Sequence, residues 1–232
     1  MQELYDIVYV LKQDVKSDEL KYSIRTVVQN FKYNRIIFYC GCPEDIKPDI
    51  HVPFVQVGIG KINKVINTLK AIVNDENITE NFWLFNDDFF IMKPFEETRP
   101  ICNGTLYSVI KMIESSKNKT TRYTKILRDT AIQLNELGFD TISYAAHAPM
   151  LINRKKAKEV LYKFESPFSF RSAYGNYWGI EGILRPDVKI STEHQEVNES
   201  LDLLSSNDTS FSKGKIGEFI RNTFTTPSKY EL

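Results

Sequence analysis

The sequence contains few of the residues that mark several specialised protein classes. It holds 10 Gly and 9 Pro in 232 residues, too few for a collagen-like or low-complexity chain. No segment approaches the ~20 consecutive apolar residues of a membrane span. The first ten residues, MQELYDIVYV, carry acids where a secretory signal needs positive charge. We therefore expect a cytoplasmic protein without a membrane segment.

Cysteine is also scarce, and two of the three cysteines are poorly spaced for pairing. Cys40 and Cys42 are separated by one residue, which is too close for an ordinary disulfide and unlike a CxxC redox or zinc pair. We expect three reduced thiols in a reducing compartment.

Net charge is absent as well, because 30 Lys and Arg balance 30 Asp and Glu. This argues against a strongly basic, non-specific nucleic-acid binder but leaves room for a local basic groove. In contrast, 15 Phe and 12 Tyr accompany a 42% hydrophobic content, which excludes a disordered chain. We expect one globular domain over residues 1–232, large enough to bury a core without disulfides or metals.

The first half of the chain alternates between two kinds of hydrophobic pattern. Short apolar runs predict strands at residues 6–11, 35–40, 51–57 and 82–85. Helical spacing predicts helices at 20–28, with Ser17 and Asp18 at its start, and at 62–73. Strands that alternate with helices indicate an α/β fold with a mostly parallel, Rossmann-like sheet flanked by helices. Ligands of such sheets bind outside the carboxyl ends of the strands.

The second half is less regular. We predict a helix at 122–137, a strand at 141–152 interrupted at His147-Ala148-Pro149, a basic helix at 154–164 and a last helix at 213–224. Residues 166–182 are rich in aromatics, Gly and Ser and give no clear assignment. The single domain would thus comprise a nucleotide-sugar half (1–95) and an irregular acceptor half (96–232).

The strongest chemical signal is Asn86-Asp87-Asp88, which follows an apolar strand and precedes another apolar run. Carboxylates beside a core need a cation, hydrogen bonds or solvent. Mg²⁺ and Mn²⁺ are commonly held by one or two carboxylates together with substrate phosphates. We predict Asp87 and Asp88 as metal ligands. The alternative is a polar turn whose side chains cap backbone groups.

This block resembles the second block of Stealth-type sugar-phosphate transferases and the Asp-x-Asp site of GT-A glycosyltransferases. Other blocks resemble Stealth blocks in the same order: Asp6-Ile-Val-Tyr9-Val, Glu19-Leu-Lys-Tyr22-Ser23-Ile-Arg25, His147-Ala-Pro149 with Arg154, and Pro227-Ser-Lys-Tyr-Glu231. The first block continues as Leu11-Lys12-Gln13-Asp14, where Stealth proteins have Trp-Val-Asp-Gly. The resemblance implies a GT-A-like fold and transfer from a nucleotide-diphosphate sugar.

The donor would be held by residues near the strand ends. The resembling blocks contain Asp6, Tyr9, Arg25 and Asn86, and Lys12 is added because it directly follows the first strand. Lys61 opens a helix whose amino terminus favours phosphate. For Lys61 the alternative is an ordinary turn with a solvated lysine. Arg25 could bind the diphosphate bidentately or form a surface ion pair.

His147 is the predicted general base, because an imidazole near its ordinary pKa of ~6.5 suits removal of a hydroxyl proton. The alternative is a core histidine, and we expect His51 and His194 at the surface. Asp88 is the second predicted catalytic residue, and Asp187 is either a late acid of the site or a strand cap. Acceptor contacts are predicted for Arg171, Tyr174, Tyr177 and Trp178, aromatics that could equally belong to the core.

The sequence thus predicts a glycosyltransferase that uses Mn²⁺ or Mg²⁺ and a nucleotide-diphosphate sugar. Its acceptor would be a glycan hydroxyl or a hydroxylated DNA base. Three alternatives stay open: a sugar-phosphate transferase of capsule synthesis, a nucleotidyltransferase and a carbohydrate-binding module without catalysis.

Overall fold

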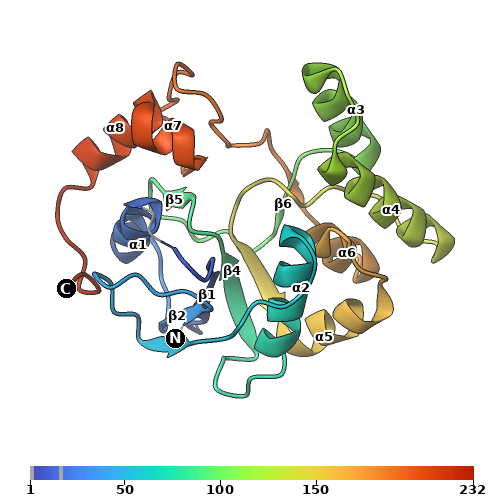
Figure 1. Ribbon diagram of the computed structural model, residues 1–232, viewed down its shortest axis with the longest axis horizontal. Helices are drawn as coiled ribbons and strands as arrows, with labels where there is room; N and C mark the ends of the chain where they lie inside the picture. The colour runs from blue at the N-terminus through green and yellow to red at the C-terminus, as the bar shows by residue number, and fades with distance from the viewer. Residues whose placement is uncertain (1–2, 16–17) are drawn as a thin grey trace.

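A five-stranded sheet lies at the centre of the molecule, with strand order β3-β2-β1-β4-β7 (Figure 1). The computed structural model describes residues 3–15 and 18–232. The sheet strands are β1 (Asp6–Val10), β2 (Ile36–Tyr39), β3 (Ile50–Val52), β4 (Asn81–Phe85) and β7 (Met150–Asn153). The first four are parallel, and β7 runs antiparallel to β4. The predicted α/β fold with a mostly parallel sheet is confirmed.

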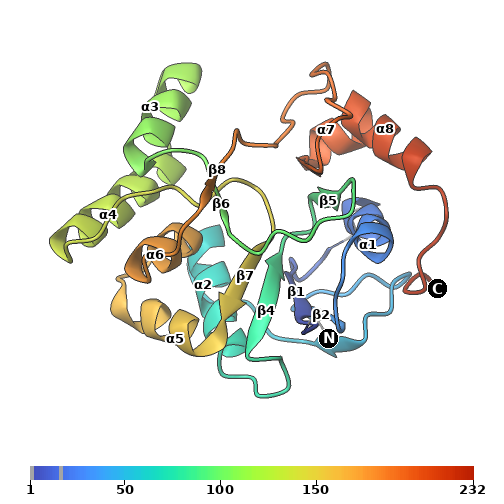
Figure 2. The ribbon, with the colours of Figure 1, turned by 180° about the vertical axis from the view of Figure 1, so that it is seen from behind.

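The two faces of β1 and β4 contribute to different parts of the core, because successive strand side chains point to opposite faces. Ile7 and Tyr9 pack in a cluster with helix α1 (Asp18–Asn30). Val8 and Leu84 face the other cluster, which includes α2 (Lys61–Ile72). Figures 1 and 2 show α1 on one side of the sheet and α2 on the other.

Further helices extend the layer on the α2 side. They are α3 (Leu106–Lys117), α4 (Arg122–Glu136), α5 (Arg154–Lys163) and α6 (Phe170–Tyr177). Thr105 and Thr121 cap α3 and α4, each in a reciprocal capping box. None of the helices in the described ranges is long and apolar enough to cross a membrane.

Two small strand pairs lie outside the central sheet. β5 (Phe89–Ile91) pairs with β9 (Leu203–Ser205), and β6 (Ile101–Cys102) pairs with β8 (Ile183–Leu184). The last helices are α7 (Asp208–Lys213) and α8 (Lys215–Thr223), which pack with β5 and β9 in a third apolar cluster.

The structure differs from the sequence prediction mainly at element ends. β3 is shorter than predicted and ends at Val52, before Pro53, which cannot donate to a strand ladder. The predicted strand at 141–152 is regular only from Met150, because the chain turns at His147, which has a φ of 44°. The unassigned region 166–182 contains α6. Ser17, a predicted cap, lies outside the described residues. All three cysteines are free thiols, as predicted.

Candidate functional site

The Asn86–Asp88 turn lies at the carboxyl end of β4 and leads directly into β5. Side chains of α1 hold β5 in place. The Ser23 hydroxyl donates to the carbonyl of Phe89 (2.6 Å), and Thr26 Oγ1 accepts from the amide of Ile91 (3.0 Å). On its other edge β5 pairs with β9. The turn is therefore fixed by elements on both sides.

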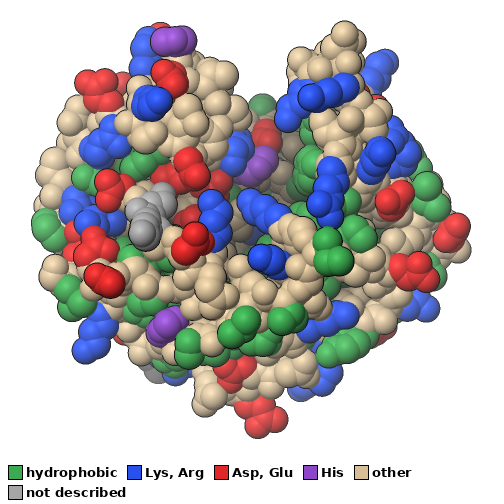
Figure 3. Space-filling model, viewed as in Figure 1, with side chains coloured by type: hydrophobic (Ala, Val, Ile, Leu, Met, Phe, Trp, Pro, Cys, Tyr) green, Lys and Arg blue, Asp and Glu red, His purple; other side chains and the backbone are tan. Residues whose placement is uncertain are grey.

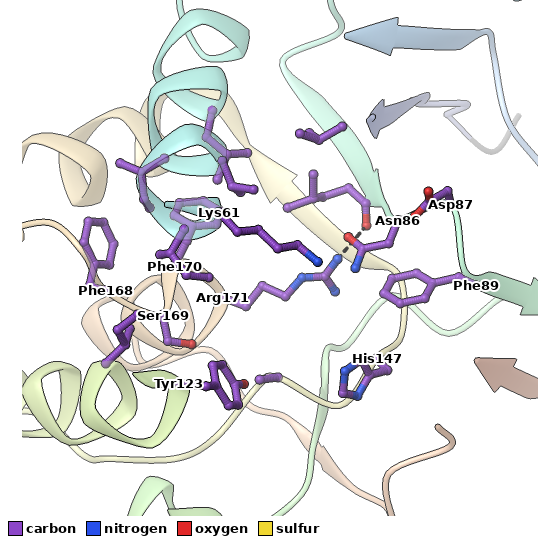
Figure 4. A pocket seen from close by; sticks show the side chains of 18 of the residues that line it. Lys61, Asn86, Asp87, Phe89, Tyr123, His147, Phe168, Ser169, Phe170 and Arg171 are labelled. Atoms are coloured by element: carbon purple, nitrogen blue, oxygen red, sulfur yellow. Dashed lines mark hydrogen bonds between the residues drawn. The ribbon is translucent and has the colours of Figure 1, made fainter. Parts of the chain in front are cut away.

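A cavity of about 260 Å³, called the chamber below, opens beside this turn (Figure 4). Its polar lining residues are Lys12, Lys61, Asn86, Asp87, His147, Ser169 and Arg171. Most of the remaining lining is aliphatic or aromatic and comes from α2, α4, β4 and the segment before α6. Polar side chains from several strand ends thus converge with an apolar wall.

The cleft continues from the chamber toward α1 and α7. Two adjoining cavities, of about 720 and 460 Å³, share the lining residues Lys12, Glu19, Asp87 and Asp208. In the space-filling view this region is a hollow between two lobes, with both acidic and basic side chains around it (Figure 3). The cleft therefore has room for a ligand larger than the chamber alone would hold.

Two lysines approach Asp87 from neighbouring elements. Lys12 follows β1, and Lys61 is the first residue of α2. The turn before Lys61 depends on Gly58 and Gly60, which have φ of 118° and 85°, a region that favours glycine. Burial raises the pKa of Asp87 and the carboxylate of Asp88 raises it further, whereas Lys12 and Lys61 lower it. The predicted acid and both predicted lysines thus share one electrostatic environment.

Asp88 forms an ion pair with a lysine of the protein, and this partner was not predicted from the sequence. Its Oδ2 accepts from Lys189 Nζ at 2.8 Å, and both side chains are mostly buried. Asp88 therefore has a cationic partner within the protein, and its role as a metal ligand stays a prediction. However, Asp88 Oδ1 is buried and has no hydrogen-bond partner within the described structure.

No group of three or more His, Cys, Asp or Glu side chains arranged to hold a metal ion occurs in the part of the chain that the structure describes. Asp87 and Asp88 nevertheless provide hard oxygen donors on one turn, including the unpaired Oδ1 of Asp88. This donor set fits a cation such as Mg²⁺, which takes one or two carboxylates and completes its shell with phosphate and water. It does not form a complete protein cage.

Glu19 lines the cleft, although in the sequence it stood only as the first residue of the Stealth-like block Glu19–Arg25 and was not among the predicted site residues. It is 2% exposed and its Oε1 accepts from Ser206 Oγ at 2.6 Å. Burial raises the pKa of Glu19 to about 7; the bond from Ser206 opposes this rise, and the carboxylates of Asp88, Asp87 and Asp208 add to it. The sequence does not reveal this environment of Glu19, because Ser206 lies 187 residues away.

His147 lines the chamber and has a carboxylate partner. Its Nδ1 lies 3.0 and 2.9 Å from the two oxygens of Asp187. A carboxylate only accepts hydrogen bonds, so Nδ1 carries the hydrogen and donates it to Asp187. Nε2 is the ring nitrogen that does not bond to Asp187. Asp187 Oδ1 also accepts from the amide of Lys189 (3.1 Å). Thus residues 187–189 contact both His147 and Asp88.

Arg171, a predicted acceptor residue, lines the chamber but donates to backbone. Its guanidinium bonds to the carbonyls of Ala148 and Leu84 (3.2 Å for the latter) and lies over the Phe89 ring, with Cζ 5.3 Å from the ring centre. Burial lowers its pKa to about 10, and Asp88 opposes this. Arg171 thereby joins β4 to the segment that precedes β7.

Three predicted donor residues lie away from the cleft, and their assignments are corrected. Asp6 is at the amino end of β1, where it is fully buried and pairs with Arg35 (2.7 Å). Tyr9 is also buried, and its hydroxyl bonds to Ser23 (2.9 Å). Arg25 binds both carboxylate oxygens of Glu231 (2.8 and 2.6 Å). These side chains stabilise the fold.

The aromatic acceptor predictions are also corrected, because none of the three residues lines the chamber. Tyr174 is buried and its hydroxyl accepts from the amide of Asn153 (3.0 Å). The Tyr177 hydroxyl donates to Glu159, and Trp178 Nε1 donates to the carbonyl of Lys156 (3.1 Å). All three attach α6 to β7 or α5. The aromatics that do line the chamber are Phe89, Tyr123, Phe168 and Phe170.

No protein-family model and no curated protein sequence matches the chain. Among solved structures, the chain is similar to a crystal structure of 4-diphosphocytidyl-2C-methyl-D-erythritol synthase. The identity is 9%, the TM-score is 0.42, and the match covers 97% of this chain and 100% of the other. At this level of similarity, activity and substrate must be argued from the site itself.

Proposed function

We propose that the protein is a glycosyltransferase that uses a nucleotide-diphosphate sugar. The observation that carries the proposal is one cleft at the carboxyl edge of a parallel sheet. Asp87, two lysines and a His–Asp pair all line it or border it. Such an edge is where α/β sheets bind their ligands, and these groups suit a diphosphate leaving group and an acceptor hydroxyl.

The donor diphosphate would lie between the lysines and the acidic turn. Lys12 and Lys61 line both the chamber and the cavity beside Asp88, so their ammonium groups can bind phosphate oxygens there. The α2 amino terminus adds backbone amides, since its cap residue Gly60 makes no side-chain cap bond. Asp87 and Asp88 would hold Mg²⁺ or Mn²⁺, which when bound neutralises charge on the departing diphosphate.

His147 would act on the acceptor. With Nδ1–H bonded to Asp187, Nε2 carries a lone pair that can take the proton of an acceptor hydroxyl. The acceptor oxygen forms a bond to the anomeric carbon of the sugar while that carbon's bond to the phosphate oxygen breaks. The nucleoside diphosphate leaves with the electron pair, and the proton stays on Nε2.

The proposal is tested by calorimetric titration of nucleoside diphosphates and their sugars, with and without Mn²⁺. Lys61→Met should weaken donor binding by about tenfold or more, since a charge-assisted hydrogen bond contributes roughly 1.5–3 kcal/mol. The matched control is Lys64→Met. Lys64 is exposed on the same helix and does not line the chamber, so affinity should stay the same. Asp87→Asn should remove the Mn²⁺-dependent part of binding.

Product analysis separates the proposed transfer from its alternatives. A glycosyltransferase releases a nucleoside diphosphate, whereas sugar-phosphate transfer releases a nucleoside monophosphate, and nucleotidyl transfer releases inorganic pyrophosphate. If no nucleotide binds with or without metal, the enzyme proposal is wrong and a binding module becomes the better explanation.

A further inference from the structure

The helical hairpin formed by α3 and α4 is strongly basic, although the whole chain has no net charge. Residues 111–128, called the basic hairpin below, contain six Lys or Arg and one acid, Glu114. Glu114 pairs with Arg128 (3.2 Å). Lys117, Lys119 and Lys125 are exposed, and the described structure records no ion pair for any of them. Figure 3 shows Lys and Arg side chains on this lobe, beside the central hollow.

The basic hairpin also forms part of the chamber. Tyr123 and Ile126, three residues apart on α4, line it. Arg122 and Lys125 have the same spacing on the adjacent, exposed helix face. The Arg122 guanidinium lies against Gly60, the residue before the chamber-lining Lys61, since a Cβ on that glycine would come within 2.4 Å of Nη2. The cationic surface is therefore continuous with the cavity.

The chamber wall is suited to a flat, weakly polar group. Phe168, Phe170 and Tyr123 line the chamber together with aliphatic side chains of α2 such as Val65 and Ile66. A sugar ring carries hydroxyls that would be left without hydrogen bonds against such a wall, which is costly. A nucleobase instead buries its faces against aromatic or apolar side chains. At about 260 Å³, the chamber is small even for a ligand pocket and suits a single ring system.

We propose that the acceptor is a hydroxyl-bearing base of a polynucleotide, bound with the base in the chamber and its phosphates on the basic hairpin. The assignment rests on the proposed glycosyl transfer. His147 lies at the polar side of the chamber, where it would take the proton of the base hydroxyl as the oxygen bonds to the sugar. A duplex base would have to leave its stack to enter, so a single strand binds more readily.

The test is fluorescence anisotropy with a labelled single-stranded DNA oligonucleotide, without donor. The double variant Lys119→Glu, Lys125→Glu should lose two phosphate contacts. Since each contact contributes ~0.7 to the slope of log K against log salt for a single strand, the slope should become shallower by about 1.4 or more. At 0.1 M salt this corresponds to binding about 25-fold weaker. The matched control is Lys155→Glu with Lys158→Glu on α5, two exposed lysines outside the chamber lining. This pair should leave affinity nearly unchanged. If both double variants lose the same affinity for the oligonucleotide, the proposal is overturned.

The base contribution is tested with an abasic oligonucleotide of the same length. Wild type should bind it at least about fivefold more weakly than the base-containing strand, as expected for a stacked base. Ala145→Leu, which fills the chamber, should abolish this difference while keeping the salt dependence. Val65→Phe is a second variant in case the first does not fold. If abasic and intact strands bind equally to wild type, or an acidic polysaccharide of equal charge competes equally well, the nucleobase assignment is wrong.

These outcomes are distinguishable from failure of the proposed function, because no nucleotide sugar is present in the binding assay. With the donor identified by calorimetry, an oligonucleotide carrying a hydroxymethyl pyrimidine should gain the mass of one sugar. Transfer to a glycan but not to this strand would overturn the acceptor assignment and leave the glycosyltransferase proposal standing.

Discussion

Glu19 provides a quantitative test of the acidic side of the cleft. It is almost fully buried and receives a hydrogen bond from Ser206. Its pKa is raised from 4.5 to about 7 in the folded protein, mainly by burial. In the unfolded chain the ordinary value applies. The folded state therefore holds its proton more tightly, and the free energy of unfolding should fall as pH rises from about 4.5 through about 7.

Glu19→Gln removes this titration and retains an oxygen that can accept from Ser206. The difference between 7 and 4.5 is about 2.5, which at ~1.36 kcal/mol for each pKa step gives about 3 kcal/mol. Relative to wild type, the variant should therefore gain up to about 3 kcal/mol of unfolding free energy between pH ~5 and pH ~8. Above pH ~8, where Glu19 is ionised in both the folded and the unfolded state, the gain should be nearly constant.

The measurement is urea unfolding of both proteins across this pH range, with a chelator present so that bound cations do not shift the acids. Glu136→Gln, at an exposed position of α4, is the control for a glutamate without burial. If the stability curves of Glu19→Gln and wild type run parallel across the range, burial does not perturb Glu19 and the reasoning fails.

Two further predictions concern residues whose roles the structure assigned or changed. Asp187→Asn should lower kcat by roughly 10²–10⁴-fold with donor KM unchanged, because an amide no longer fixes the His147 tautomer. NMR of the imidazole nitrogens measures the tautomer without turnover, and an unchanged tautomer in the variant would contradict this prediction. Glu231→Gln should lower the unfolding free energy by about 1–3 kcal/mol, since Arg25 loses a charged partner that is mostly buried. Donor affinity, measured by calorimetry, should not change, and a parallel loss of affinity would return Arg25 to the donor site.

The sequence predicted the sheet and the acidic turn because both are encoded locally. Alternating apolar runs specify strands, and Asn86, Asp87 and Asp88 are adjacent in the chain. The carboxyl-edge rule then placed Lys12 and Lys61 beside Asp87 without knowledge of any side-chain contact. His147 was also identified from its local sequence; it lines the chamber, and its role as general base stays a prediction.

The remaining site residues depend on contacts across long sequence separations. Lys189 and Asp88 are 101 residues apart, and Ser206 and Glu19 are 187 apart. No periodicity connects such pairs. The helix with Ser23 and Arg25 was recognised from its local motif. The resemblance did not show which face of this helix points toward the cleft. In the structure Ser23 bonds to β5 and Arg25 to Glu231.

The long separation between Asp88 and Lys189 has a consequence for synthesis of the chain. At ~5–20 residues per second, the acidic turn leaves the ribosome roughly 5–20 s before its lysine partner. Until β9 arrives, β5 has only the side chains of α1 on one edge and an open ladder on the other. Open ladders pair readily with other chains. The nascent protein therefore carries an unpaired strand edge next to the Asn86–Asp88 turn, and slower growth at low temperature lengthens the time for which that edge is exposed.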